Sequence, residues 1–263
     1  MGKRGGSNMN SDLAITQTAS LGSHDNTFIA EQHNHSGLSI IDATQMAFEI
    51  FHQYYPQLKD EALRELHNML EEELEKQNPS VIIPPSPRIA VPTLQGASIT
   101  PEDDVRRLYA KLLASAMNID VNEQVHPAFS KIIEQMSPFD AILMKRIIDI
   151  SDSIPVANVR FTFGTSYLTE VMPHYYSPYF DVLNDNWATS LSIENLSRLQ
   201  LINLFSVTVT TFEYDSFRTY SFVMERFEYA KKYNPTRELE IEMTNYTIQL
   251  NDFGKQFARI CMP

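Results

Sequence analysis

The chain has 263 residues, 43% of them hydrophobic, so it can bury a sizeable core in one large domain or two small ones. Its formal net charge of −12 opposes nonspecific binding to nucleic acid and to anionic membranes. The single cysteine, Cys261, excludes an internal disulfide framework and a cysteine-rich zinc site. No segment reaches the ~20 apolar residues of a membrane span, and no apolar stretch of a secretory signal follows Lys3 and Arg4. We therefore expect a cytoplasmic protein without cofactor, metal or membrane span.

Residues 1–38 are predicted to form a flexible or β-prone assembly segment. They are rich in Gln, Asn, Thr, His and Ser, with short alternating runs that suit strands lacking a core of their own. The segment resembles the Asn/Gln/Gly-punctuated motifs of bacterial amyloid-type signalling proteins through Gln17, Asn26, Phe28, Ile29, Gln32, Asn34 and Gly37. That resemblance implies stacking of copies, although Ala30 stands where such motifs more often have Gly. A disordered tail and a strand docked on the chain's own core stay open as alternatives.

Residues 39–78 are predicted to be helical. Ser39 is a plausible N-cap with Asp42 three residues later, and Pro56 is expected to kink or restart the helix. The second half carries a coiled-coil-like stripe on a charged helix, made of Leu63, Leu66, Leu70 and Leu74. This stripe is interpreted either as packing on the chain's own core or as an oligomer contact.

Residues 79–99 form a proline-rich stretch. Prolines at this density favour an extended connector over a helix, and the stretch contains Pro79, Pro84, Pro85, Pro87 and Pro92. We expect it to lie against a surface, because valines and isoleucines are interspersed, and to mark a domain boundary.

Residues 100–185 are predicted to form a helical body. Thr100 is the expected cap of its first helix, with Pro101 at the first helical position and acidic residues complementing the helix dipole. A turn around His126 and Pro127 leads to a short helix from Phe129, and 137–140 repeat the cap pattern before a third helix. The aromatic region 155–185 has no clear assignment.

Residues 186–263 are predicted to form a winged-helix-like module. A helix is expected over 192–205, a hairpin over 206–227 with its turn at Asp215 and Ser216, a strand over 246–250, and a terminal helix from Asn251. The fold class expected is therefore mainly α (α+β), with a helical body, this module and the polar N-terminal segment.

Several separated blocks within residues 80–263 resemble the Abi-alpha family of bacterial proteins, named for abortive infection. They are 84–90 (PPSPRIA), 107–117 (RLYAKLLASAM), 126–129 (HPAF), 137–140 (SPFD), 195–199 (NLSRL) and 250–257 (LNDFGKQF). The resemblance implies a role in phage defence and supplies no active site. The family's closing block usually has Leu-Thr before Phe-Gly, where this chain has Leu250, Asn251 and Asp252; Asn and Thr both cap helices, so the fold expected is unchanged.

The candidate catalytic and metal-binding residues are few. His24, His33 and His35 are interpreted as solvated, and His126, Pro127, Phe129 and Asp140 as a structural turn in which Asp140 or Glu134 could orient the His126 ring. We expect no catalytic residue. The predicted groove-reading helix has Arg198 as its only cation beside Glu194, and the wing adds Arg218, so nucleic-acid binding is not expected.

Three functions stay open at this point. The first is a non-enzymatic phage-defence protein that acts through self-assembly, as a homo-oligomer, or through a protein partner in a defence system. The second is a toxic or nucleotide-sensing effector enzyme that uses His126. The third is a winged-helix transcriptional regulator.

Overall fold

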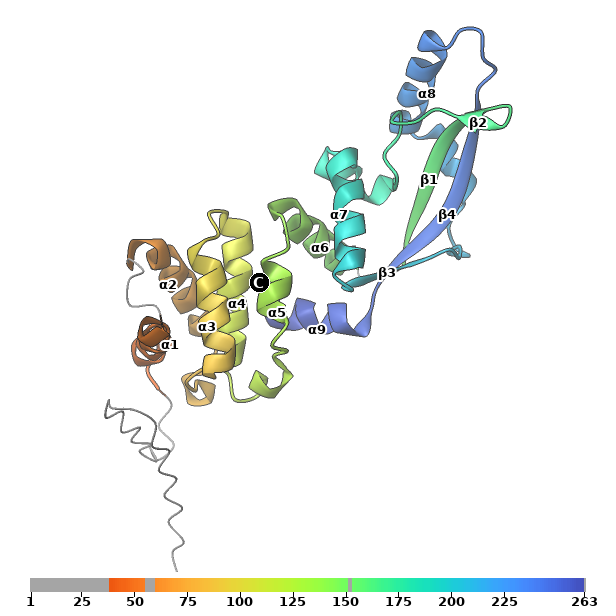
Figure 1. Cartoon of the computed structure of the whole chain (residues 1–263). Helices are drawn as coiled ribbons and strands as arrows, with labels where there is room; N and C mark the ends of the chain where they lie inside the picture. Colours follow the sequence, from red (N-terminus) through yellow and green to blue (C-terminus); the bar gives the residue numbers. More distant parts are fainter. Residues whose placement is uncertain (1–37, 55–59, 151–152, 263) are drawn as a thin grey trace, which may run out of the picture. The chain divides into compact units, whose positions relative to one another are not determined.

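Helices come first along the chain, and a small antiparallel sheet is built into its C-terminal half (Figure 1). The computed structural model describes residues 38–54, 60–150 and 153–262, which belong to one unit, Ser36–Pro263. The helices are α1 (Ile40–Tyr54), α2 (Asp60–Glu75), α3 (Pro87–Ser98), α4 (Asp103–Ala116), α5 (Phe129–Ile133), α6 (Pro138–Ile150), α7 (Asn186–Arg198), α8 (Ser221–Tyr233) and α9 (Asp252–Cys261). The mainly α, α+β class is confirmed.

Ser39 caps α1 as predicted. Its Oγ accepts a hydrogen bond from the Asp42 backbone N–H at 3.1 Å and donates one to the Asp42 carboxylate at 2.6 Å. The first bond satisfies a backbone donor that the first turn of a helix otherwise leaves open, and the second holds the Ser39 hydroxyl in place. Pro56 lies outside the described residues, between the end of α1 and the start of α2.

The leucine stripe of α2 belongs to the chain's own core. Leu63, Leu66, Leu70 and Leu74 are all buried, and α2 packs along α4 and also contacts α1 and α3. The apolar side of the helix is covered from within the chain, so these leucines do not form a surface for a second copy. This corrects the interpretation of the stripe as an oligomer contact.

The proline-rich stretch is predicted to be an extended connector, but from Pro87 to Ser98 it is helical. Helix α3 begins at Pro87 and runs through Pro92. The missing N–H of Pro87 costs no hydrogen bond, because the first N–H groups of a helix have no acceptor within the helix. At Pro92 only the carbonyl of Arg88 loses its helical donor, and Arg88 is exposed, so water can replace that bond. Helix α3 packs on α1 and α4 through buried residues such as Ala90 and Leu94.

The three helices predicted after residue 100 are confirmed as α4, α5 and α6. The cap of α4 differs, because Glu102 occupies the N-cap position and the Thr100 hydroxyl donates to the Gly96 carbonyl of α3 at 2.8 Å. The cap of α6 follows the prediction: the Asp140 N–H donates to the Ser137 Oγ, and the Ser137 N–H donates to the Asp140 carboxylate.

The sheet is antiparallel, with the strand order β2-β1-β4-β3 (Figure 1). Its strands are β1 (Ile154–Phe163), β2 (Ser166–Tyr167), β3 (Ile202–Phe205) and β4 (Glu240–Leu250). Strand β1 lies almost wholly in the aromatic region 155–185 and pairs with β4 along all but its last residue, from Ile154 opposite Ile248 to Thr162 opposite Glu240. The region 100–185 is therefore not helical throughout.

The winged-helix hairpin predicted over 206–227 is wrong. Residues 214–219 form a short 3-10 helix and residues 221–233 form α8. Val223, Phe227 and Ala230 are buried at helical spacing, and a packed face with this period outweighs the alternation that favoured strands. The predicted helix over 192–205 is also shifted: α7 begins after Asp185, whose side chain caps it, and ends before β3.

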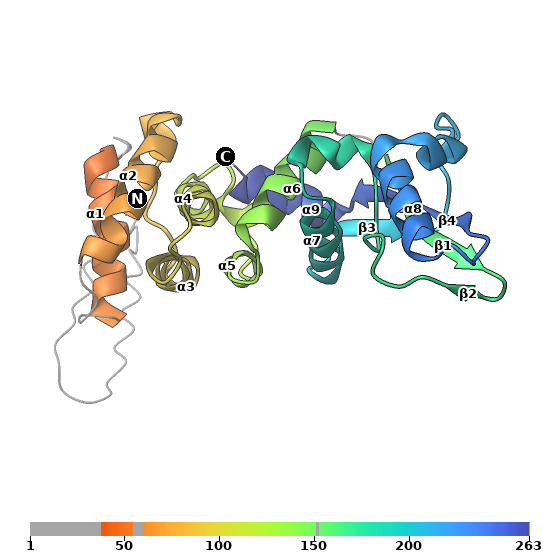
Figure 2. The same cartoon turned by 90° about the horizontal axis from the view of Figure 1, so that it is seen from above.

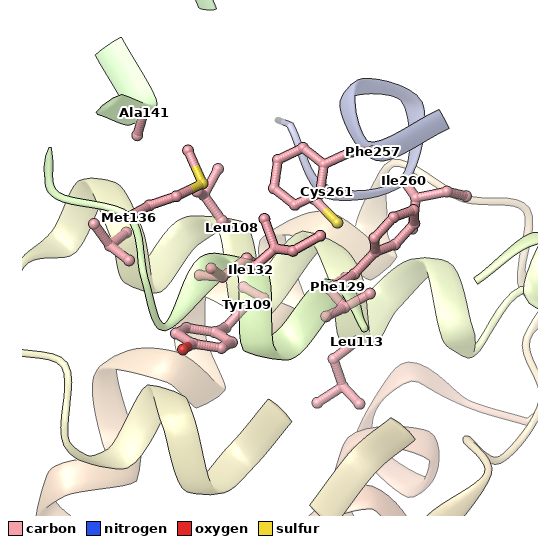
Figure 3. Packing of buried hydrophobic residues seen from close by; sticks show 14 of the residues in the cluster. Leu108, Tyr109, Leu113, Phe129, Ile132, Met136, Ala141, Phe257, Ile260 and Cys261 are labelled. Atoms are coloured by element: carbon pink, nitrogen blue, oxygen red, sulfur yellow. The ribbon is translucent and has the colours of Figure 1, made fainter. Parts of the chain in front are cut away.

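Two hydrophobic cores hold the unit together. The larger core lies among the helices and reaches the base of the sheet; in Figure 3, side chains of α4, α5 and α9 converge within it, including Leu108, Phe129 and Phe257. The smaller core lies between α8 and one face of β1 and β4, with α8 over the sheet in Figure 2, and it contains Phe161, Phe217 and Phe227.

Candidate functional site

The His126 turn is structural in its contacts. The His126 Nδ1 accepts a hydrogen bond from the Ala128 N–H at 3.1 Å, and the His126 carbonyl accepts one from the Phe129 N–H at 3.0 Å. The ring packs against Phe129 and Phe253, with centroids 5.8 and 5.5 Å away. Neither Asp140 nor Glu134 is bonded to this ring within the described residues, so the imidazole is held by backbone and aromatic groups.

Asp140 instead joins α6 to α7. Besides the Ser137 N–H, its carboxylate accepts a hydrogen bond from the Asn195 side-chain amide at 2.9 Å. The same amide donates to the Gln135 carbonyl at 3.0 Å, and the Arg198 guanidinium donates to the Asn195 and Gln135 side chains. Two sequence blocks that carry the family resemblance, 137–140 and 195–199, therefore meet at one junction.

A second junction is made by the closing block. Asn251 caps α9 by accepting the Gly254 N–H at 2.7 Å, and its amide donates to the Gln200 carbonyl at 2.8 Å. A Cβ on Gly254 would lie 1.9 Å from the Leu201 carbonyl oxygen, so only glycine permits this approach. The cap expected of Asn251 is confirmed, and the amide also ties α9 to the turn before β3.

The cations considered for nucleic-acid binding are engaged within the chain. The Arg198 guanidinium is bonded to Asn195 and Gln135, and that of Arg218 donates to the Ile241 carbonyl and pairs with Asp215. Phosphate contacts need free cations on one surface. The geometry at these two residues does not supply them.

A histidine–carboxylate pair that the sequence did not reveal lies beside the sheet. His174 Nδ1 is 2.8 Å from Glu194 Oε1, and both side chains are about half exposed. The His174 ring stacks on Tyr175 with centroids 4.3 Å apart, and burial raises the pKa of Tyr175, as do Tyr246 and Glu194. The two residues lie 20 positions apart in the sequence and belong to no common motif, so no local pattern predicts the pair. The Glu194 carboxylate orients the His174 ring.

The outer face of α7 carries two large apolar side chains in its first half, before the exposed Glu194 and Arg198. Trp187 and Leu191 lie one helical turn apart and expose 46% and 69% of their surface, and Val182 just before the helix exposes 63%. Contiguous exposed apolar surface is a common feature of sites that contact other proteins.

The remaining sequence predictions concern the N-terminal segment, Cys261, and metal-binding or membrane-spanning segments. The predicted assembly residues Gln17 to Gly37, together with His24, His33 and His35, lie outside the described residues. Cys261 is buried, and burial raises the pKa of its thiol, so it does not supply a thiolate at neutral pH. Within the described ranges, no group of three His, Cys, Asp or Glu side chains could hold a metal ion, and no helix there has the length and apolar character of a membrane span.

A comparison with known protein families matches the part of the chain that contains these junctions. A family model described as abortive infection alpha matches residues 58–261 and so takes in α2 as well as the blocks noted in the sequence. No curated protein and no solved structure gives a match. Since the match covers more than half of the sequence, the chain belongs to the abortive infection alpha family.

Proposed function

We propose that this chain acts in phage defence by abortive infection as a non-enzymatic protein, through contact with a protein partner or with further copies of itself. The family supplies the biological setting. The observation that carries the mode of action is the outer face of α7, where Trp187 and Leu191 are exposed on a rigid, capped helix.

Two further features support this proposal. The motif blocks are engaged in helix junctions, where Asp140, Asn195 and Asn251 bond to backbone and side-chain groups of the same chain. Apolar side chains on the surface are stabilised when a partner covers them, by about 25 cal/mol for each Å² removed from water. The N-terminal segment with Gln17 to Gly37 is proposed as a second means of assembly.

Leu191→Glu tests the α7 face. A carboxylate at this position would be buried by any partner that covers the helix, which costs more than the lost apolar contact. We expect cells that produce this variant to lose phage protection, measured by plaque formation, while the circular dichroism spectrum and thermal stability of the protein stay those of the parent.

Ile99→Glu is the matched control. Ile99 is also 69% exposed but lies at the end of α3, so the same change in charge and polarity should leave protection intact. Full protection by the Leu191→Glu protein would contradict the proposal. A folded His126→Ala protein that loses protection while Leu191→Glu keeps it would favour the effector enzyme instead.

A further inference from the structure

Along the edge of β1 that faces away from β4, one pair of backbone hydrogen bonds, here called a rung, is missing. At one end, the Leu168 N–H donates to the Phe161 carbonyl at 2.9 Å. At the other, Ala157 and Tyr176 exchange both backbone bonds at 2.9 Å. Between these points the chain 169–175 bends away from the strand, and no backbone bond joins it to Val159 in the part of the chain that the structure describes.

The backbone groups of Val159 point into this gap. In an antiparallel strand, successive residues direct their N–H and C=O groups to opposite sides. Ala157 directs both groups to Tyr176, away from β4, so Val159, two residues later, does the same. Its N–H and C=O are therefore an open donor–acceptor pair at the strand edge.

A cavity of about 200 Å³ occupies the place of the missing rung. Its wall includes Val159, Arg160, Tyr167, Glu170 and His174. Glu170 has φ of 60°, in the left-handed region that residues other than glycine rarely adopt, so the bend that opens the cavity is held against local strain. The volume is below the ~300–1,000 Å³ of sites for drug-sized ligands, which limits the occupant to a small molecule.

Arg160 provides a cation at the cavity wall. Its Nε donates to the Asn158 side chain at 2.8 Å, and its guanidinium lies over the Tyr167 ring at 5.0 Å. These contacts fix the plane of the group. Among the described residues, its two terminal nitrogens have no hydrogen-bond or ion-pair partner, so both remain free to bind a carboxylate or phosphate in a bidentate manner.

We propose that this cavity binds a small anionic molecule with an amide-like donor–acceptor pair. The amide would complete the missing rung by bonding to the Val159 N–H and C=O, and the anionic group would bind the Arg160 guanidinium. Glu170 also lines the cavity and opposes added negative charge, so a singly charged carboxylate is favoured over a phosphate. An acylated amino acid or peptide carboxyl terminus and a nucleotide share this chemistry.

Calorimetric titration of the full chain would test the site with two probes, an N-acetyl dipeptide with a free carboxylate and a set of nucleoside monophosphates. We expect saturable binding of one class, and the class that binds identifies the source of the ligand. Arg160→Gln should weaken this binding by about 10-fold or more, because hydrogen bonds to charged groups are the stronger ones. Arg88→Gln, at an exposed arginine of α3, should leave it unchanged.

Amide resonances give a readout that a general loss of stability would not reproduce. In the parent and in Arg88→Gln, the bound probe should shift the Val159 and Phe161 amide signals. Equal affinity in the Arg160→Gln protein would overturn the proposal, as would shifts confined to residues away from β1. The absence of binding by both probe classes at millimolar concentration would also overturn it.

Discussion

The two cores of this protein are built from different kinds of contact. Around the larger core, the helices meet at polar junctions, where Asp140, Asn195 and Asn251 bond to groups at helix ends. The smaller core is aromatic, with Phe217 surrounded by Tyr176, Phe212 and Tyr214 at centroid distances of 5.1–5.9 Å. Caps are local patterns that a sequence displays, whereas aromatic packing depends on segments far apart in the chain.

The comparison predicts that the smaller core depends most on single aromatic side chains. Phe217 is fully buried, so Phe217→Ala should lower the free energy of unfolding by about 3–5 kcal/mol, from lost burial and the cavity left behind. Urea denaturation measures this change, with the 63% exposed Tyr233→Ala as control.

The number of transitions in the same urea denaturation shows whether the two cores unfold independently. If the sheet and α8 unfold separately from the helices, Phe217→Ala should produce an early additional transition, while Leu113→Ala in the larger core should not. A single shifted transition for both variants would show that the two cores unfold as one cooperative unit.

The junction of α9 is predicted to tolerate substitution of Gly254 poorly. Gly254→Ala would bring a methyl group against the Leu201 carbonyl, and the backbone shift required should cost up to about 3 kcal/mol. Thermal unfolding gives the measurement. Lys255→Ala, at the exposed neighbouring position, is the control, and equal stability of both variants would disprove the tight approach.

The smallest effect is expected at Glu73 of α2, which pairs with Lys76 just after the helix and with Lys111 of α4. Burial alone would raise the pKa of Glu73, but the ammonium groups of Lys76 and Lys111 outweigh it and lower the pKa below its usual 4.5. The ionised carboxylate therefore contributes stability that is fully present above 4.5 and is lost as the pH falls through the lowered value.

Glu73→Gln should accordingly be less stable than the parent at neutral pH, and the gap should narrow in acid. Chemical denaturation at several pH values tests this, with the exposed Glu228→Gln as control, because surface ion pairs contribute little. A gap that stays constant down to acid pH would contradict the assignment to Glu73.

The sequence identified elements whose signals are local. The Ser39 cap, the Ser137–Asp140 cap and the Asn251 cap were all predicted, because each lies within a few residues of the helix it starts. Helix α3 contradicts the prediction because the positions of the prolines permit a helix that their number disfavours: Pro87 starts the helix, and Arg88, whose carbonyl loses its helical donor at Pro92, is exposed.

The elements that were missed depend on distant partners. Strand β1 is defined by its pairing with β4, and α8 resembled a strand because residues 217–227 alternate as well as they repeat at helical spacing. The cavity at Val159 could not be predicted, since it arises from a rung that the folded chain leaves out. The His174–Glu194 pair likewise forms only when α7 packs beside the sheet.

The pairing of β1 with β4 also has a consequence for biosynthesis. Residues 154–163 leave the ribosome before residues 240–250, so the strand that anchors the sheet has no main partner until β4 has also been synthesised. The helices α1 to α6 precede β1 and can pack on one another first, while the edge of β1 stays unpaired until β4 is available. A nascent chain halted before Glu240 would therefore present a bare strand to chaperones or to other chains.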